Sequence, residues 1–173
     1  MKKIFLLLIA ITITSCSPKA KLAMHEDQKI LVGKGSMKDL QQEPFIEWFS
    51  QGFKEYNLGE ENEDAIEEKL KEYTITIFMG TWCEDSQNQV PKFYKILKEV
   101  DFPLRKATLI TMSRDKTTPE QFEKGLNITN VPTFIFYKNG KEINRIVESP
   151  VISLEQDILN IISGKNYKHI YAE

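Results

Sequence analysis

The stretch Tyr73–Ser86 reads YTITIFMGTWCEDS and joins an apolar run to a cysteine. Tyr73–Met79 is short, rich in β-branched residues and almost free of polar breaks, which predicts a buried central strand. Gly80 permits a turn, and residues 84–86 (EDS) suit the first turn of a helix. The sequence therefore predicts a strand that ends in a turn and presents Cys83 at the start of a helix.

This position makes Cys83 a candidate nucleophile. The free N–H groups and the dipole of a helix N-terminus stabilise a thiolate, which is the reactive form of cysteine. Glu84 and Asp85 oppose this by placing carboxylates beside the sulfur, whereas the Ser86 hydroxyl can donate a hydrogen bond to it. The residue types alone do not decide whether the pKa of the Cys83 thiol is lowered or raised. A buried, inert cysteine is the alternative, but the position after Trp82 at a helix start favours a reactive thiol.

Two motifs in this chain resemble those of the thioredoxin superfamily. Residues 82–86 (WCEDS) resemble the thioredoxin active site with its second cysteine replaced by serine. Pro91 stands where thioredoxins kink the same helix, and residues 131–140 (VPTFIFYKNG) resemble their cis-proline strand and the following hairpin. The resemblance covers residues 73–163. It implies a thioredoxin-like three-layer α/β/α sandwich, with a mixed sheet of about five strands and helices on both faces.

The resemblance also implies which residues form the site. The implied catalytic residues are Cys83, Ser86 and Trp82, and the implied substrate-binding residues are Val131, Pro132 and Thr133. A cis peptide bond is expected before Pro132. The ordinary alternative is a trans proline, which is tolerated at the first residue of a strand; the two motifs together favour cis.

The implied chemistry is only half that of a thioredoxin. Thioredoxins attack a disulfide with the first cysteine and resolve the mixed disulfide with the second, and Ser86 cannot do the second step. The chain also departs from the family at Ile77, where thioredoxins carry a buried aspartate, and at Glu148, where glycine usually lines the groove. A single thiolate can still exchange with disulfides if another thiol resolves the intermediate. We therefore expect monothiol exchange, isomerisation or removal of small-thiol adducts, with protein or small-molecule thiols and disulfides as partners.

Two other classes of function remain open. A non-catalytic binding or adaptor module would use the groove formed by Trp82, Cys83 and Pro132 to hold a polypeptide, because a fold does not imply a function. Other thiol chemistry, such as peroxide sensing, is the third possibility. The rate at which Cys83 reacts with a thiol label across pH distinguishes a reactive thiol from a silent one.

The beginning of the chain predicts export. A charged start, Met1-Lys2-Lys3, precedes an apolar run over residues 4–13 that is too short to span a bilayer, so residues 1–15 are predicted to be a signal peptide. Residues 13–16 (ITSC) resemble a bacterial lipobox, which implies a lipid on Cys16 and stable membrane attachment. An ordinary signal peptide followed by a stray cysteine is the alternative. We expect a membrane-anchored lipoprotein that faces the periplasm or the cell exterior.

Composition sets further bounds on the 173-residue chain. It is 41% hydrophobic and 28% charged, as in ordinary globular proteins. Loss of residues 1–15 removes two lysines and changes the net charge from −2 to −4. A net negative charge does not favour binding to nucleic acid. No Cys/His cluster has metal-ligand spacing, and no cofactor is expected. The predicted order is a lipidated tether over residues 16–28 and one thioredoxin-like domain over residues 29–173, expected to be monomeric.

Periodicity and turn residues predict the other elements. The predicted strands are 30–32, 104–112, 133–138 and 141–147, and the predicted helices are 45–56 behind a first-turn Pro44, 63–72, 90–100, a short one over 118–125, and 149–162 before a polar tail. The region before residue 73 is longer than in a minimal thioredoxin, so one extra helix or a long irregular connection is expected there. The aromatic stripe Phe45–Tyr56 is either core or the wall of a partner groove, and core is favoured. Arg114 and Asp115 are expected to be solvated loop residues.

Overall fold

The computed structural model describes residues 18–172. The predicted signal peptide and Cys16 lie outside the described residues, so they stay predictions. The strands are β1 Lys21–His25, β2 Gln28–Gly35, β3 Thr74–Met79, β4 Ala107–Thr111, β5 Thr133–Lys138 and β6 Lys141–Val147. The helices are α1 Met37–Leu40, α2 Ile46–Glu55, α3 Glu60–Leu70, α4 Glu84–Glu99, the short 3-10 helix η1 Leu104–Lys106, and α5 Leu154–Ile162.

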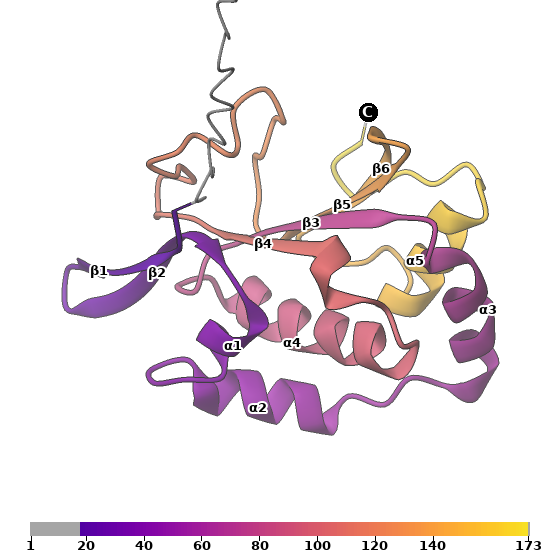
Figure 1. Cartoon of the computed structure of the whole chain (residues 1–173), viewed down its shortest axis with the longest axis horizontal. Coiled ribbons are helices and arrows are strands. Elements are labelled where there is room, and N and C mark those ends of the chain that lie inside the picture. Colours follow the sequence, from indigo (N-terminus) through magenta and orange to yellow (C-terminus); the bar gives the residue numbers. More distant parts are fainter. Residues whose placement is uncertain (1–17, 173) are drawn as a thin grey trace, which may run out of the picture.

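The strands form one mixed sheet in the order β1-β2-β4-β3-β5-β6 (Figure 1). The predicted central strand, β3, pairs in parallel with β4 and antiparallel with β5, so that Ile77 lies between Leu109 and Phe134. The helix α4 connects β3 to β4 in the expected βαβ unit. The predicted thioredoxin-like α/β fold with a mixed sheet is confirmed, with six strands where about five were expected. The helices were expected on both faces, but α1 to α5 all contribute to one apolar cluster.

Alternate side chains of the strands enter two separate apolar clusters. The larger cluster lies on the face that carries α1, α2, α3, α4 and α5, all below the sheet in Figure 1. The smaller cluster lies on the other face and is covered by segment 113–130, a connection built from turns above the sheet. Its buried members are Phe78, Ile110, Met112, Val131 and Ile135. The alternation follows from the two-residue period of a strand.

The predicted tether is wrong for residues 21–28. Lys21–His25 is a strand that pairs antiparallel with β2, and His25 faces Gln28 across a two-residue turn. Glu26 takes a positive φ of 54° in that turn. The signal was present in KLAMH, whose apolar Leu22 and Met24 alternate with other residues, but only five residues carry it. The hairpin adds the sixth strand at one edge of the sheet.

The predicted short helix over residues 118–125 is also wrong, because turns occupy this stretch. Thr118 does act as a cap, since its hydroxyl accepts a hydrogen bond from the Phe122 N–H at 2.9 Å. Gln121 then takes a φ of 56°, and Asn127 one of 51°. This left-handed backbone is incompatible with a continuing right-handed helix. A local cap therefore forms without the helix that it usually begins.

Several predicted boundaries shift by a few residues. The strand predicted from residue 104 begins at Ala107, after η1. The last helix begins at Leu154 because the Ser153 hydroxyl caps it by accepting from Gln156 N–H. Pro44 is not in the first turn of α2: it precedes the N-cap Phe45 and follows a cis peptide bond.

The aromatic stripe of α2 is mainly core, as favoured. Phe45 and Phe49 are buried, and Trp48, Phe53 and Tyr56 are partly buried against the same cluster. The stripe packs on α4, where Phe49 meets Tyr94 edge to face at a centroid distance of 6.0 Å. Helix α2 therefore supports the helix that begins at Cys83. Within residues 18–172, no helix is both long and apolar enough to cross a bilayer.

Candidate thiol site

Cys83 lies at the N-cap of α4, as the sequence predicted. The strand β3 ends at Met79, and the Cys83 N–H donates to the Gly80 carbonyl oxygen at 3.0 Å, which closes the turn. Cys83 has extended backbone angles (φ −97°, ψ 124°), while Glu84 is the first helical residue. The turn thus holds the thiol at the end of the central strand and over the N-terminus of α4.

The thiol is half-buried and contacts the second motif. Its S–H donates to the carbonyl oxygen of Val131 at 3.2 Å. The peptide bond between Val131 and Pro132 is cis, as expected. The structure therefore brings Cys83 and Pro132 together, although 48 residues separate Cys83 from Val131. The role of these residues in substrate binding stays a prediction.

Ser86 occupies the position of a second active-site cysteine but does not bond to Cys83. Its side chain is fully buried, and its hydroxyl accepts a hydrogen bond from the Gly80 N–H at 3.2 Å. The hydrogen bond of Ser86 thus stabilises the turn that carries the thiol. Cys83 is a free cysteine and the only cysteine within residues 18–172.

Trp82 forms one wall beside the thiol. Its indole N–H donates to the Met112 carbonyl oxygen at 3.0 Å, which ties the turn to the end of β4. The ring lies so close to Gly80 that a Cβ added there would stand 2.5 Å from a ring carbon. Glycine is required at this position by the close approach of the indole.

Arg114 is an exposed loop residue, as expected, and it also contacts the site. Its guanidinium carbon lies 5.4 Å from the centroid of the Trp82 ring, and one of its N–H groups donates to the Gln28 side chain at 2.7 Å. The available signal was its position just after a strand of a βαβ unit, where functional residues gather in α/β sheets. Pairing with Trp82 is a tertiary contact that the local sequence does not show.

The other side of the thiol is formed by Pro132 and its neighbours. The Glu148 N–H donates to the Pro132 carbonyl oxygen at 2.6 Å, and the Thr133 hydroxyl donates to the Asn130 carbonyl oxygen at 2.6 Å. The Glu148 carboxylate accepts from the Asn130 amide at 3.2 Å and from the Tyr171 hydroxyl. Asn130 and Tyr171 were not predicted, because each reaches Glu148 only in the folded chain.

Ile77 departs from the family as the sequence indicated. It is fully buried in the larger cluster, on the helix-covered face. An apolar side chain at this depth neither accepts nor donates a proton, so this position offers no proton-transfer group behind the thiol.

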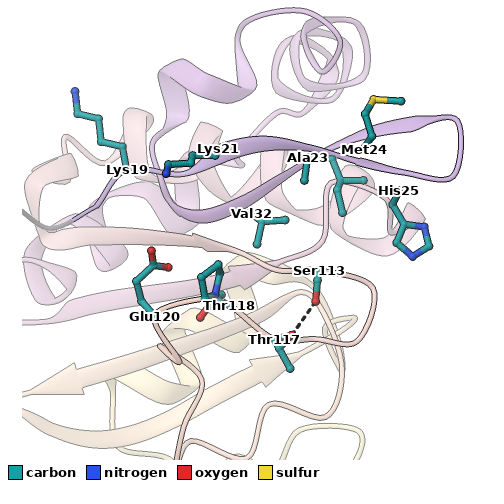
Figure 2. Close-up of a pocket in the computed structure, with 12 residues that line it drawn as sticks. Lys19, Lys21, Ala23, Met24, His25, Val32, Ser113, Thr117, Thr118 and Glu120 are labelled. Atoms are coloured by element: carbon teal, nitrogen blue, oxygen red, sulfur yellow. Dashed lines mark hydrogen bonds between the residues drawn. The ribbon is translucent and has the colours of Figure 1, made fainter.

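A separate cavity of about 510 Å³ lies beside the site, between the β1–β2 hairpin and segment 113–120. Figure 2 shows Val32 pointing from the hairpin toward Ser113 and Thr118, with the hydrogen bond between Ser113 and Thr117 on the opposite wall. The segment on that wall also carries Arg114. Within residues 18–172, no group of three or more His, Cys, Asp or Glu side chains is placed to hold a metal ion.

The comparisons with known proteins identify the family of the chain. The family model described as thioredoxin matches residues 36–157, which include Trp82, Cys83, Ser86 and Pro132. The chain belongs to the thioredoxin family. In this thioredoxin-family chain the match covers the helices before residue 73 as well as the two motifs.

Relatives of this thioredoxin-family chain include a TPR repeat-containing thioredoxin of Arabidopsis thaliana, 27% identical over 97 residues, which are 56% of this chain and 24% of the relative. A thioredoxin-like protein of Acanthamoeba polyphaga mimivirus is 24% identical over 95 residues, 55% of this chain and 66% of the relative. Glutaredoxin 3 of Danio rerio is 26% identical over 102 residues, 59% of this chain and 29% of the relative. The chain thus spans about a quarter of the length of the first of these relatives.

A solved structure supports the fold. A protein of unknown function from Pseudomonas aeruginosa has a TM-score of 0.59 and 13% sequence identity, covering 77% of this chain and 93% of that protein. At this identity the likeness concerns the fold alone.

Proposed function

We propose that the protein carries out monothiol thiol–disulfide exchange through Cys83, with protein or small-molecule disulfides. The observation that carries this proposal is the contact of the free Cys83 thiol with the carbonyl of Val131, next to the cis-bonded Pro132. Membership of the thioredoxin family and the thioredoxin and glutaredoxin relatives support the same class of activity.

The exchange has two balanced steps. In the first, the Cys83 thiolate attacks one sulfur of a disulfide, so that a bond forms between Cys83 and that sulfur while the other sulfur leaves as a thiolate. In the second, an external thiolate attacks the mixed disulfide and releases the Cys83 thiolate. The external thiol is needed because position 86 holds a hydroxyl, which does not exchange with disulfides.

The neighbouring residues support this chemistry in distinct ways. The Cys83 thiol must lose its proton before attack, because the thiolate is the nucleophile. The hydrogen bond that the S–H donates to the Val131 carbonyl oxygen is lost with that proton. Trp82 and Pro132 form two walls beside the sulfur, and Thr133 holds the segment before Pro132 through the Asn130 carbonyl. Ser86 maintains the turn through Gly80.

We further propose that the protein acts as an exported lipoprotein, anchored through a lipid on Cys16 and facing the periplasm or the cell exterior. The support is the charged and apolar start of the chain and the ITSC sequence that precedes the domain. Mass spectrometry of the mature protein tests this: a chain that begins at Cys16 with added lipid is expected, and an unmodified Cys16 contradicts it.

The exchange reaction is tested with the neutral 2-hydroxyethyl disulfide. The experiment uses a Cys16→Ser background, because Cys16 is the other cysteine of the chain. In that background the protein should gain one thioalkyl adduct after acid quench, detected by intact mass, and Cys83→Ala should gain none. The variant Ser86→Cys should release the adduct by forming an internal disulfide. Adducts that persist in Cys83→Ala, or a wild-type thiol that does not react, would instead favour a binding or adaptor module that uses the same groove.

A further inference from the structure

We infer that Arg114 and Glu148 set the charge preference of the groove around Cys83. Arg114 favours anionic groups on the Trp82 side of the thiol, and Glu148 favours cationic groups on the Pro132 side. This inference rests on the proposed exchange reaction and adds its substrate class: a disulfide whose two sides carry opposite charges.

The position of Arg114 is held by two contacts. The guanidinium lies over the indole of Trp82, and it donates to the Gln28 side chain at the start of β2. A cation above an aromatic face is attracted by the ring, and the exposed guanidinium keeps N–H donors for a further acceptor. The positive charge of Arg114 is therefore held over the ring of Trp82, the residue that precedes Cys83.

Glu148 is fixed next to Pro132, the residue that follows the carbonyl bonded by the thiol. Its backbone bonds to Pro132, and its carboxylate accepts from Asn130 and Tyr171. The residue has a φ of 64°, a left-handed conformation that glycine adopts with less strain. The chain thus carries a carboxylate beside Pro132, at a position whose backbone conformation favours glycine.

Neither charge is neutralised by an ion pair within residues 18–172. The partners of Glu148 are an amide and a phenol, and those of Arg114 are an amide and an indole ring. Other carboxylates neighbour these residues in the chain: Glu84 and Asp85 follow Cys83, and Asp115 follows Arg114. These carboxylates stay unchanged in the variants below. The rate ratios of each variant are therefore compared with those of the wild-type protein.

The test uses three small symmetric disulfides with the whole chain in the Cys16→Ser background, so that Cys83 is its one thiol. They are cystamine, which carries two cations, 3,3′-dithiodipropionate, which carries two anions, and the neutral 2-hydroxyethyl disulfide. The rate of adduct formation is measured by intact mass and divided by the rate with the neutral reagent. Each ratio is also divided by that of free cysteine, which removes intrinsic differences between the disulfides.

The two variants should act in opposite directions. Glu148→Gln should lower the cystamine ratio about two- to fivefold, and Arg114→Gln should lower the dithiodipropionate ratio by a similar factor, the size expected for unit charges separated by several ångströms in a solvated groove. Both effects should largely disappear in about 1 M salt. Arg114→Lys and Glu148→Asp keep the charges and should stay close to wild type.

Matched controls remove charges that lie away from the groove. Glu67→Gln on α3 and Lys141→Gln on β6 should leave both ratios unchanged. If the neutral disulfide reacts with wild type but neither groove variant changes its ratio while circular dichroism shows native folding, the inference is overturned and the exchange reaction stands. A wild-type thiol that does not react with the neutral disulfide overturns the proposed function, and this inference with it.

Discussion

The two faces of the sheet are covered in different ways. The helix-covered face buries a large apolar cluster that contains the aromatic side chains of α2 and, from β5, Phe134 and Phe136. The turn-covered face buries a small cluster, against which Phe122, Leu126 and Ile128 are only partly buried. Trp82 and Cys83 pack on the small cluster. The helix-covered face therefore supplies most of the stability, and the Cys83 thiol lies on the face with the smaller apolar cluster.

The comparison is tested most strongly by truncating one phenylalanine on each face. Phe93 is fully buried and stacks on Phe134 at a centroid distance of 4.3 Å, so Phe93→Ala should lower the free energy of unfolding by about 3–5 kcal/mol. Phe122→Ala should cost about 1–2 kcal/mol, because less apolar surface is lost from water. Urea denaturation measures both, and equal losses would contradict the difference between the faces.

The next effect concerns the close approach of Trp82 to Gly80. Gly80→Ala places a Cβ 2.5 Å from the indole, so the ring must move, at a cost of about 1–3 kcal/mol. Trp82 fluorescence should change in a Trp48→Phe background, and the reaction rate of Cys83 should change with it. Gly59→Ala is the matched control, because its Cβ meets no atom within 4 Å. An unchanged spectrum in Gly80→Ala would show that the indole is not held in place.

A smaller effect is expected from the cap on the turn-covered face. Thr118→Val removes the acceptor of the Phe122 N–H and the donor to Glu123, at 2.9 and 2.6 Å, while keeping the shape of the side chain. The free energy of unfolding should fall by about 1 kcal/mol. Thr117→Val, an exposed neighbour on the same segment, is the control and should cost less in the same denaturation experiment.

The smallest expected effect depends on pH and involves the C-terminal tail. Burial, followed by the charge of Arg145, lowers the pKa of His169, whose Nδ1 accepts a hydrogen bond from the Tyr171 N–H. Because the folded pKa lies below the unfolded value, its contribution to stability is present above about pH 6.5 and is lost as pH falls through the folded pKa. An NMR titration of His169 should give a midpoint below 6.5, and a higher midpoint would contradict the assignment.

The sequence predicted the helix-covered face better than the turn-covered face, for a physical reason. Helical periodicity and strand patterns arise locally, so the central strand, the helix after Cys83 and the core role of Phe49 were predictable. Segment 118–125 carries a cap and a first-turn proline that favour a helix, yet Gln121 adopts a left-handed backbone in the folded chain. Tertiary packing decides that choice.

The site shows the same division. Cys83 and Pro132 were predictable because each lies in a motif of contiguous residues. Arg114, Asn130 and Tyr171 were not, since each joins the site through a contact that spans many residues or through a side-chain orientation. The preference of the Ser86 hydroxyl for Gly80 over Cys83 likewise depends on the path of the turn.

If Cys16 carries a lipid, as proposed, the pairing of β1 limits how far the domain can move from the membrane. The Ala20 N–H already donates to the Lys34 carbonyl oxygen, so the sheet holds the chain from residue 20 onward. The four steps from Cys16 to Ala20 span at most about 14 Å. A lipid on Cys16, as proposed, would therefore keep Ala20 and the sheet close to the membrane surface. Collisions of Cys83 would then be restricted to a thin layer beside the lipid surface, where disulfides of membrane-bound neighbours are reached more often than those in free solution.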